Sequence, residues 1–330
     1  MSHNNKNEDN TEIKNTKDTL TELINEYNKS INKSNGIFAK YLGPSSNNMI
    51  ELGKKFEIIN QYDHAINCYL KSLEIFGTNK LSSSSNKNSV LISSSLCEVY
   101  KLLMKCYLEK RENLKTLSLV KKNDKIQEAS YNPGLLGYVR VACCQHAFEY
   151  GMKLFELYKS EKKYLEGSQT ILDIIKNLGD FIDNATIMRL VDEGIVLTSS
   201  CFPLHTIKFL TIKYKLFITM KTKKEGLEVI NELCNFHKCP ISNKIRDNWL
   251  MDKCLCEIIV NDHVLMLGHV VFKFPHFENT EQYNFIKRIM EATMTEDVET
   301  IITEYQYTLQ FDEEYMQILF NELRNLCSLS

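Results

Sequence analysis

The stretch MIELGKKFEIINQYDHAINCYLKSLEI, residues 49–75, carries the pattern that decides the fold class. Its first half places Leu52 and Phe56 four residues apart, and its second half repeats that spacing with Ala65 and Tyr69. Residues that are four apart lie on the same face of a helix. The stretch therefore predicts two short helices whose apolar faces meet across a tight turn.

This stretch resembles one tetratricopeptide repeat, in which two antiparallel helices approach closely at small side chains. The small residues are Gly53, Ala65 and Ser72, and the aromatic Phe56 and Tyr69 are expected to fill the space between the helices. Two weaker copies are predicted at Tyr164, Gly167 and Ile171, which stand where Tyr62, Ala65 and Tyr69 stood, and at Gly226 and Ile230. The resemblance implies an all-α fold, an irregular tetratricopeptide-like α-solenoid of antiparallel helix pairs whose concave surface binds other proteins.

The bulk composition agrees with a helical fold and disfavours several classes of function. With 12 Gly and 5 Pro in 330 residues, the chain has too few turn residues for a β-sandwich or barrel. The 40 Lys and Arg nearly balance the 42 Asp and Glu, so no overall field favours nucleic acid or an anionic membrane. Residues 255–274 are apolar but contain Glu257, Asp262, His263 and His269, which favours two core helices over insertion in a membrane.

Two segments of low-complexity composition are expected to lack regular structure. Residues 1–17 are polar and rich in Asn, which predicts a disordered N-terminus, and the Ser and Asn of residues 81–95 predict a mobile loop at 77–95. Helix starts are predicted after Pro44 and Ser45, and at Asp63, Pro133, Pro203, Pro240 to Ser242, Pro275 and Asp312. We therefore predict a single helical-repeat domain over residues 18–328.

A group of cysteines and a histidine resembles a zinc cluster at first sight. The group consists of Cys234, His237, Cys239, Cys254 and Cys256. Cys254 and Cys256 are two apart in a predicted helix and therefore point to different faces, unlike the paired thiolates of a zinc site. We expect these thiols to be small buried apolar side chains, and we predict no metal and no cofactor.

A second group of reactive side chains has the composition of a nucleophilic site. Cys143 and Cys144 lie close to His146 in a predicted helix, where near neighbours do not face one another, so no base is aimed at either thiol. Trp249, the single tryptophan, is predicted to anchor the core. We therefore predict no catalytic residue and expect that the chain is not an enzyme.

A run of carboxylates near the C-terminus is the best candidate for a binding surface. No Lys or Arg occurs between residues 291 and 314. Carboxylates near a helix start are stabilised by the helix dipole, yet so many like charges form a face that attracts a basic partner. The candidate partner-binding residues are Glu291, Glu296, Asp297, Glu299, Glu304, Asp312, Glu313 and Glu314.

The ends of the chain carry a second resemblance. The first motif, within residues 246–267, is Lys253-Cys254-x-Cys256-Glu257. The second, within residues 285–326, is Ile289-Met290-Glu291-Ala292-Thr293 followed by Glu296-Asp297-x-Glu299-x-Ile301. The third, near the N-terminus, is Pro44 before a helix that leads to Gly53. These stretches resemble the family of the 40-kilodalton huntingtin-associated protein, also called the factor VIII intron 22 protein family. The chain departs from the vertebrate members in its short connection at 235–242, where they carry a long Pro-rich insert.

This family resemblance implies a scaffold or adaptor in vesicle trafficking. It implies binding to huntingtin, a very large HEAT-repeat protein, and through it a link to a Rab GTPase on early endosomes. The location implied is the cytoplasm, with association with early endosomes and the nucleus.

The alternative is the soluble NSF attachment protein family, which is also built from tetratricopeptide-like helix pairs. Phe274-Pro275-x-Phe277 resembles a turn of that family, and Leu329 is penultimate as a leucine is there. This resemblance implies an adaptor in SNARE complex disassembly. It predicts that the chain stimulates ATP hydrolysis by NSF, and that deletion of Leu329 abolishes the function of the chain.

Overall fold

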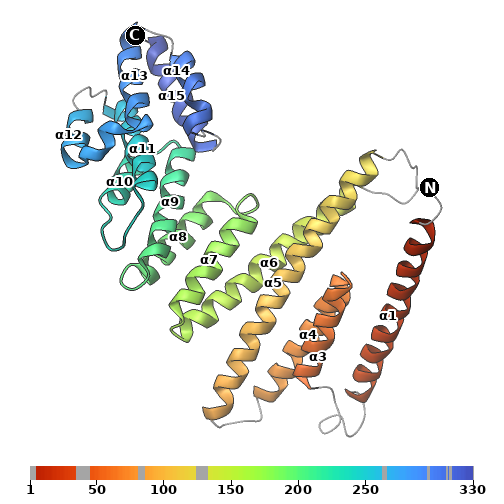
Figure 1. Ribbon diagram of the computed structural model, residues 1–330. Helices are drawn as coiled ribbons and strands as arrows, with labels where there is room; N and C mark the ends of the chain where they lie inside the picture. The colour runs from red at the N-terminus through yellow and green to blue at the C-terminus, as the bar shows by residue number, and fades with distance from the viewer. Residues whose placement is uncertain are drawn as a thin grey trace. The chain divides into compact units, whose positions relative to one another are not determined.

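The computed structural model of the protein describes residues 5–34, 45–80, 86–123, 133–261, 266–295, 298–309, 311 and 314–329. Every regular element in these residues is a helix, which confirms the predicted all-α class. The chain divides into two compact units, residues 1–181 and 182–330 (Figure 1). The single helical-repeat domain predicted over residues 18–328 stays a prediction.

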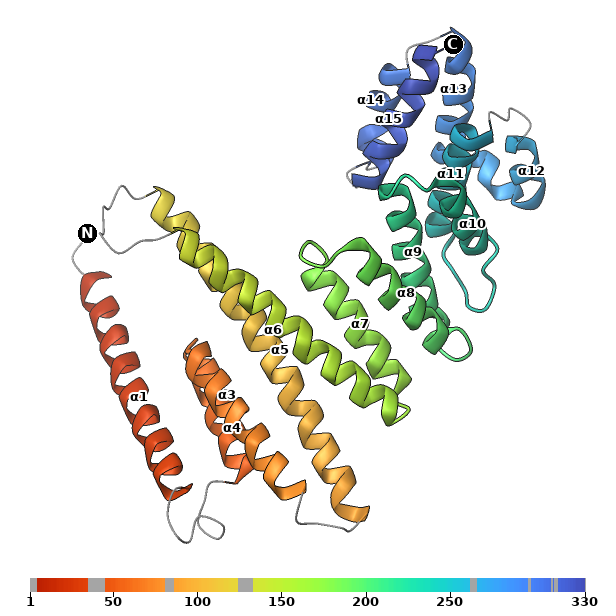
Figure 2. The ribbon, with the colours of Figure 1, turned by 180° about the vertical axis from the view of Figure 1, so that it is seen from behind.

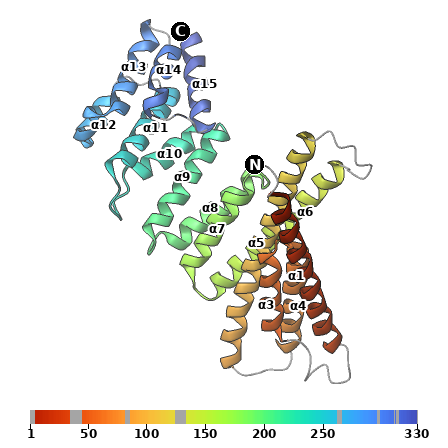
Figure 3. The same ribbon diagram turned by 45° about the vertical axis from the view of Figure 1, so that its right-hand side comes forward.

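Unit 1 is a succession of helices in which each packs against the next. Its helices are α1 (Asn5–Ser34), α3 (Ser46–Ile58), α4 (Tyr62–Lys80), α5 (Asn86–Asn123), α6 (Pro133–Ser160) and α7 (Tyr164–Leu178). Contacts join α3 to α4, α4 to α5, α5 to α6 and α6 to α7, and α1 packs against α3 (Figure 3). The predicted helix starts at Ser45 and Pro133 are confirmed, and the Ser45 hydroxyl accepts a hydrogen bond from the backbone N–H of Asn48 at 3.1 Å.

In helices α1 and α5 the structure differs from two predictions of irregular structure. Helix α1 begins at Asn5, where the sequence predicted disorder over 1–17, and Leu23 on its second half is buried. Helix α4 runs to Lys80 and α5 begins at Asn86, so most of the predicted loop at 77–95 is helical, while residues 81–85 lie outside the described residues. A packed segment nucleates the helix, and each polar residue added to its end then forms one more backbone hydrogen bond. The helix propensity of these polar residues lowers the stability only slightly, so the helix extends through them.

Unit 2 begins as a succession of helices in which each packs against the next, from α8 to α11, and it then closes on itself. Its helices are α8 (Asn184–Thr198), α9 (Pro203–Thr219), α10 (Lys223–Cys234), α11 (Asn243–Asn261), α12 (Met266–Lys273), the 3₁₀ helix η1 (Pro275–Asn279), α13 (Glu281–Thr295), α14 (Val298–Leu309) and α15 (Glu314–Leu329). Helix α15 packs against α9 and α11 as well as α14. An ion pair of 2.6 Å joins Lys223 to Glu322 across this closure. In a simple solenoid each repeat contacts only its neighbours, so unit 2 departs from that arrangement.

The apolar stretch at 255–274 divides into two helices, as the sequence predicted. Helix α11 ends at Asn261 and α12 begins at Met266. Both helices contribute to the core of unit 2, with Leu255 and Val270 buried. In the part of the chain that the structure describes, no helix combines the length and the apolar composition needed to span a bilayer.

Three turns share one backbone geometry. After α3, α6 and α9, one residue has positive φ, namely Asn60 (57°), Lys162 (59°) and Lys221 (61°). At each turn the following N–H donates a hydrogen bond of 2.9 Å to the carbonyl five residues earlier, in the pairs Gln61 to Phe56, Lys163 to Tyr158 and Thr222 to Phe217. The weaker sequence copies predicted at Gly167 and Gly226 follow the second and third of these turns. The spacing found in the sequence therefore corresponds to a turn that recurs in the structure.

Each of these turns leads into a small residue that lies against the preceding helix. Ala65, Gly167 and Gly226 occupy this position, and each donates its N–H to the carbonyl four residues earlier. Gly167 lies against Phe155, and Gly226 lies against Ile218. Small residues at these points let the two helices of each pair approach closely.

The left-handed residue at the α6–α7 turn offers a test of this geometry. Lys162 is exposed and carries a Cβ that destabilises a positive φ, so Lys162→Gly is expected to raise the free energy of unfolding by about 0.5–1 kcal/mol. The matched control Lys176→Gly, at an exposed position in the last turn of α7, should lower it by up to about 1 kcal/mol. Urea denaturation followed by circular dichroism measures both values. Equal losses in the two variants would contradict the assigned turn.

Candidate functional site

The predicted acidic surface belongs to the last three helices of unit 2. Glu291 lies near the end of α13, Glu299 and Glu304 lie on α14, and Glu314 is the first residue of α15. All four side chains are exposed. The other four candidates, Glu296, Asp297, Asp312 and Glu313, lie outside the described residues.

Two of these carboxylates have cationic partners that the sequence did not reveal. Arg324 of α15 forms an ion pair with Glu299 at 2.5 Å, and Arg288 of α13 forms one with Glu304. The hydrogen bond with Glu304 raises the pKa of the Arg288 guanidinium. The expectation that the carboxylates are uncompensated is therefore wrong for Glu299 and Glu304, because helix packing brings in arginines from outside the run. Both pairs remain partly exposed, where such pairs contribute little to stability.

An exposed tyrosine lies within the acidic set and was not predicted from the sequence. Tyr307 on α14 is 89% exposed, one helical turn after Glu304. An aromatic ring beside a carboxylate suits a guanidinium, which can stack on the ring while it pairs with the acid. The spacing of Thr303, Glu304 and Tyr307 could have indicated this exposed position, because these residues share one face of the helix. That face is turned away from the buried Ile301 and Ile302.

Three of the four cysteines of the apparent zinc cluster lie in the core, whereas Cys239 is only partly buried, unlike the prediction. Cys234, Cys254 and Cys256 are buried, as predicted, and burial raises the pKa of Cys256 to about 12. The hydroxyl of Tyr214 lies 3.5 Å from the Cys256 sulfur. Within the ranges that the structure describes, no group of three or more His, Cys, Asp and Glu side chains is placed to hold a metal ion.

His146 faces aromatic rings and a carboxylate. Its ring centroid lies 4.9 Å from that of Tyr107, and its Nδ1 atom lies 3.7 Å from the carboxylate of Glu149. Cys143 and Cys144 are buried, and burial raises the pKa of the Cys143 thiol. The geometry thus agrees with packing roles for both thiols. Trp249 is likewise buried in the core of unit 2, as predicted.

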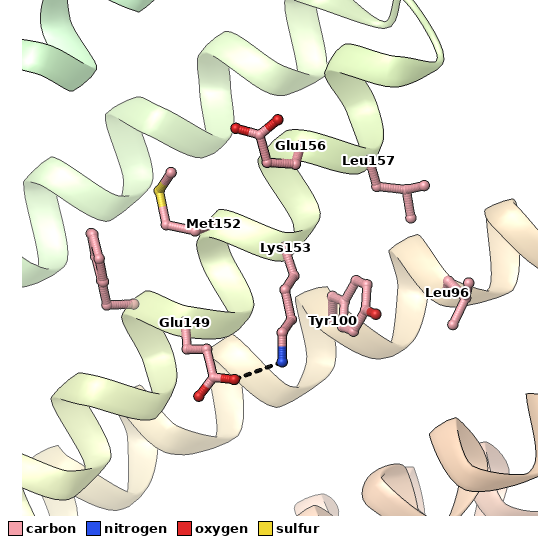
Figure 4. Close-up of a pocket in the computed structure, with 8 residues that line it drawn as sticks. Leu96, Tyr100, Glu149, Met152, Lys153, Glu156 and Leu157 are labelled. Carbon is pink, nitrogen blue, oxygen red and sulfur yellow. Dashed lines mark hydrogen bonds and ion pairs between the residues drawn. The ribbon is translucent and has the colours of Figure 1, made fainter. Parts of the chain in front are cut away.

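A groove between α5 and α6 is the second candidate site, and sequence reasoning missed it. Its volume is about 680 Å³, and its walls are formed by Leu96, Tyr100, Phe148, Glu149, Met152, Lys153, Glu156 and Leu157 (Figure 4). Lys153 reaches toward Glu149, with 2.6 Å between ammonium and carboxylate, whereas Glu156 points away from it. The pattern in the sequence was the apolar pair Phe148 and Met152, which follows Cys144 at a helical spacing of four residues.

Comparisons with known proteins add no family to these observations. No known protein family matches the chain, and no curated protein matches it significantly. The functional argument therefore rests on the residues and on their geometry.

Proposed function

We propose that the chain is a non-enzymatic scaffold of tetratricopeptide-like helix pairs that binds other proteins. The observation that carries this proposal is the α3–α4 pair, in which Gly53 of one helix lies directly against the ring of Tyr69 of the other. Phe56 and Ser72 are buried in the same pair, as the repeat pattern requires. The recurrence of its turn after α6 and α9 supports an irregular α-solenoid, and folds of this kind present extended surfaces to protein partners.

The partner we propose is a very large HEAT-repeat protein of the huntingtin kind. The support is the sequence resemblance to the family of the 40-kilodalton huntingtin-associated protein at the ends of the chain, which falls on α3, α11 and α13 to α15. The same resemblance supports a link to a Rab GTPase on early endosomes. Because a fold alone does not determine function, the identity of the partner is a proposal that concerns the surface residues and not the helical fold.

We propose that the partner binds the acidic residues of α13 to α15 together with Tyr307. Exposed ion pairs such as Glu299 with Arg324 are weak, so a basic partner competes for the carboxylates with the chain's own arginines. Tyr307 supplies the exposed aromatic side chain that is enriched at protein interfaces. Association through such a surface is expected to weaken as the salt concentration rises.

Charge reversal tests this surface. The triple variant Glu296→Lys, Asp297→Lys, Glu299→Lys is expected to weaken capture of the partner by about tenfold or more without unfolding the chain, because it replaces attraction by repulsion. The partner is first identified by affinity purification from the native cell, as the very large protein that co-elutes in equal amount. Binding of that purified partner is then measured quantitatively.

The control variant carries the same change of charge on another helix of unit 2. Glu225→Lys, Glu228→Lys, Glu232→Lys alters three exposed residues of α10, one of them in the first turn as Glu299 is in α14. This control should bind as the natural chain does. If the two charge-reversal variants bind the partner equally well, the acidic surface is not the contact. If no large protein co-elutes with the natural chain, the scaffold function itself is refuted. The adaptor role in SNARE disassembly stays a prediction, separated by its dependence on Leu329.

A further inference from the structure

We propose that Lys238, Arg246 and Lys273 of unit 2 form a basic surface that binds an acidic peptide segment of a partner protein. The basic surface uses none of the acidic residues of α13 to α15 and has the opposite charge, so it adds a second binding site to the proposed scaffold. Three observations support it, namely the distribution of charge in the sequence, the partners of the three cations and the side chains that lie beside them.

Two segments of unit 2 contain cations but no carboxylate. Neither residues 233–246 nor residues 263–277 include an Asp or a Glu. The fold brings the two segments together, because α11 packs against both α10 and α12 (Figure 2). The Lys273 ammonium at the end of α12 donates a hydrogen bond to the side-chain oxygen of Asn235, which follows α10. Tertiary structure thus concentrates positive charge that the sequence divides between two places.

The three cations bind neutral oxygen atoms. The Arg246 guanidinium donates to the backbone carbonyl of Phe236 at 3.4 Å, and the Lys238 ammonium donates to that of Ser199 at 2.8 Å. The Nε–H of Arg246 has no acceptor in the part of the chain that the structure describes, and there none of the three cations forms an ion pair with a carboxylate. A neutral acceptor leaves the charge uncompensated, so each cation can still attract an anion.

The carboxylate that adjoins the basic surface is already engaged. Asp247 follows Arg246 in α11, but it is 6% exposed and its carboxylate lies 2.9 Å from Nε2 of His276. By contrast, Lys213 of α9 pairs with Asp192 of α8 at 2.7 Å. Helix packing in unit 2 can therefore supply an exposed carboxylate to a lysine, and it does not do so at the basic surface.

An aromatic ring lies beside the cations. The centroid of the Phe274 ring is 5.9 Å from the guanidinium carbon of Arg246 and 5.8 Å from Nζ of Lys273. Apolar side chains adjoin both cations in the chain, with Ile245 48% exposed and Phe272 88% exposed. A ligand that reaches both cations therefore meets apolar surface as well as charge. A peptide that carries Asp and Glu together with Leu or Phe fits this combination better than a bare phosphate ion does.

The number of cations favours a peptide over nucleic acid or a membrane. Duplex DNA carries one charge per about 1.7 Å of its length, and proteins that bind it contact many phosphates. Recognition of anionic lipids typically uses clusters of about four to eight Lys and Arg. The basic surface is defined by three cations, on a chain whose 42 Asp and Glu exceed its 40 Lys and Arg. Local attraction of this size is sufficient for a short acidic peptide.

The first test measures binding of a synthetic fluorescent peptide to the full chain by fluorescence anisotropy. In this peptide Asp and Glu alternate with Leu. The natural chain is expected to bind it, and the dissociation constant should rise with the salt concentration. A control peptide with Asn and Gln in place of Asp and Glu should bind at least about tenfold more weakly. Absence of binding, or equal binding of the two peptides, overturns the proposal.

The second test locates the contact. Lys238→Glu with Lys273→Glu is expected to raise the dissociation constant of the acidic peptide at least about tenfold, because it replaces attraction by repulsion at two exposed positions. The control Lys208→Glu with Lys287→Glu makes the same change of net charge at exposed positions of α9 and α13, and it should bind nearly as the natural chain does. If the first variant binds no more weakly than the control, the basic surface is not the contact.

A loss of folding would imitate a loss of binding, so circular dichroism and urea denaturation are measured for each variant. The milder pair Lys238→Gln with Lys273→Gln removes the two charges without introducing new ones. It should keep the helical content and raise the dissociation constant by a smaller factor. Natural affinity in this folded variant contradicts the role of the two lysines.

The third test separates an acidic peptide from an anionic membrane. Vesicles of phosphatidylcholine that contain phosphatidylserine are expected to leave the peptide bound, as vesicles of phosphatidylcholine alone do. Displacement of the peptide by the phosphatidylserine vesicles alone would show that the basic surface recognises a membrane, and the assignment to a peptide would then be wrong.

Discussion

Phe285→Ala is expected to lower the free energy of unfolding by about 3–5 kcal/mol, the largest loss that we predict for one substitution. Phe285 is fully buried on α13, and its ring centroid lies 5.1 Å from that of Phe311, 5.4 Å from that of Tyr305 and 6.1 Å from that of Phe320. Removal of the ring leaves a cavity among three aromatic neighbours that cannot all move inward at once. The aromatic cluster therefore holds α13, α14 and α15 together.

Trp249 provides the measurement for this prediction. It is the single tryptophan and is buried in the core of unit 2, so its fluorescence during urea denaturation reports on the unit that contains Phe285. The matched control Tyr307→Ala removes an aromatic ring that is almost fully exposed on α14, and it should change the stability by less than about 0.5 kcal/mol. A loss for Tyr307→Ala as large as that for Phe285→Ala would contradict the assigned core.

Gly53→Ala is expected to lower the free energy of unfolding by about 1–3 kcal/mol, although alanine favours helices more than glycine does. A Cβ atom on Gly53 would overlap the ring of Tyr69, which is fully buried and cannot swing aside. The Tyr69 hydroxyl also donates a hydrogen bond of 2.5 Å to Glu57, and Glu57 pairs with Lys105 of α5 at 2.6 Å. The ring is thus fixed at its hydroxyl by Glu57 and enclosed by the core, and the helices must separate to admit the methyl group.

The control for this contact is Gly77→Ala in the same helix pair. Gly77 is exposed on α4 and a Cβ there meets no neighbouring atom, so this change should raise the stability by about 0.5–1 kcal/mol. The double variant Gly53→Ala, Tyr69→Leu tests the cause, because removal of the ring removes the clash. Its loss should be smaller than the sum of the two single losses, measured by urea denaturation and circular dichroism. Strict additivity would show that the ring does not oppose the methyl group.

The proposed acidic surface recognises its partner mainly by charge. The acidic residues around Tyr307 depend on charge, so binding there should respond strongly to salt.

Much of the helical architecture followed from local patterns. The N-cap at Ser45 and the proline at Pro203 marked helix starts, and the spacing from Gly53 to Tyr69 indicated a close helix pair. These features depend on residues within a few turns of one another, so the sequence contains their cause. The weaker copies at Gly167 and Gly226 were recognised for the same reason, since their turns are closed by hydrogen bonds within six residues.

Amino-acid composition gave a wrong prediction of disorder for segments that are polar but continuous with a packed helix. Residues 5–17 and 86–95 are rich in Asn, Ser and Lys, which favours disorder when each segment is considered alone. In the structure they extend α1 and α5, whose other residues, such as Leu23 and Leu103, are buried. Helix formation is cooperative along the chain, so the outcome depends on packing outside the polar segment.

The sequence by itself determined the all-α class, the helix starts and the recurrent turn, because each depends on short-range spacing. Tertiary structure decided which charges meet and which faces stay exposed. Arg324 neutralises Glu299, and α15 returns to contact α9, although no local pattern connects these residues. Ion pairs and exposed surfaces depend on the positions of residues distant in the chain, and those positions follow from the packing of the whole core.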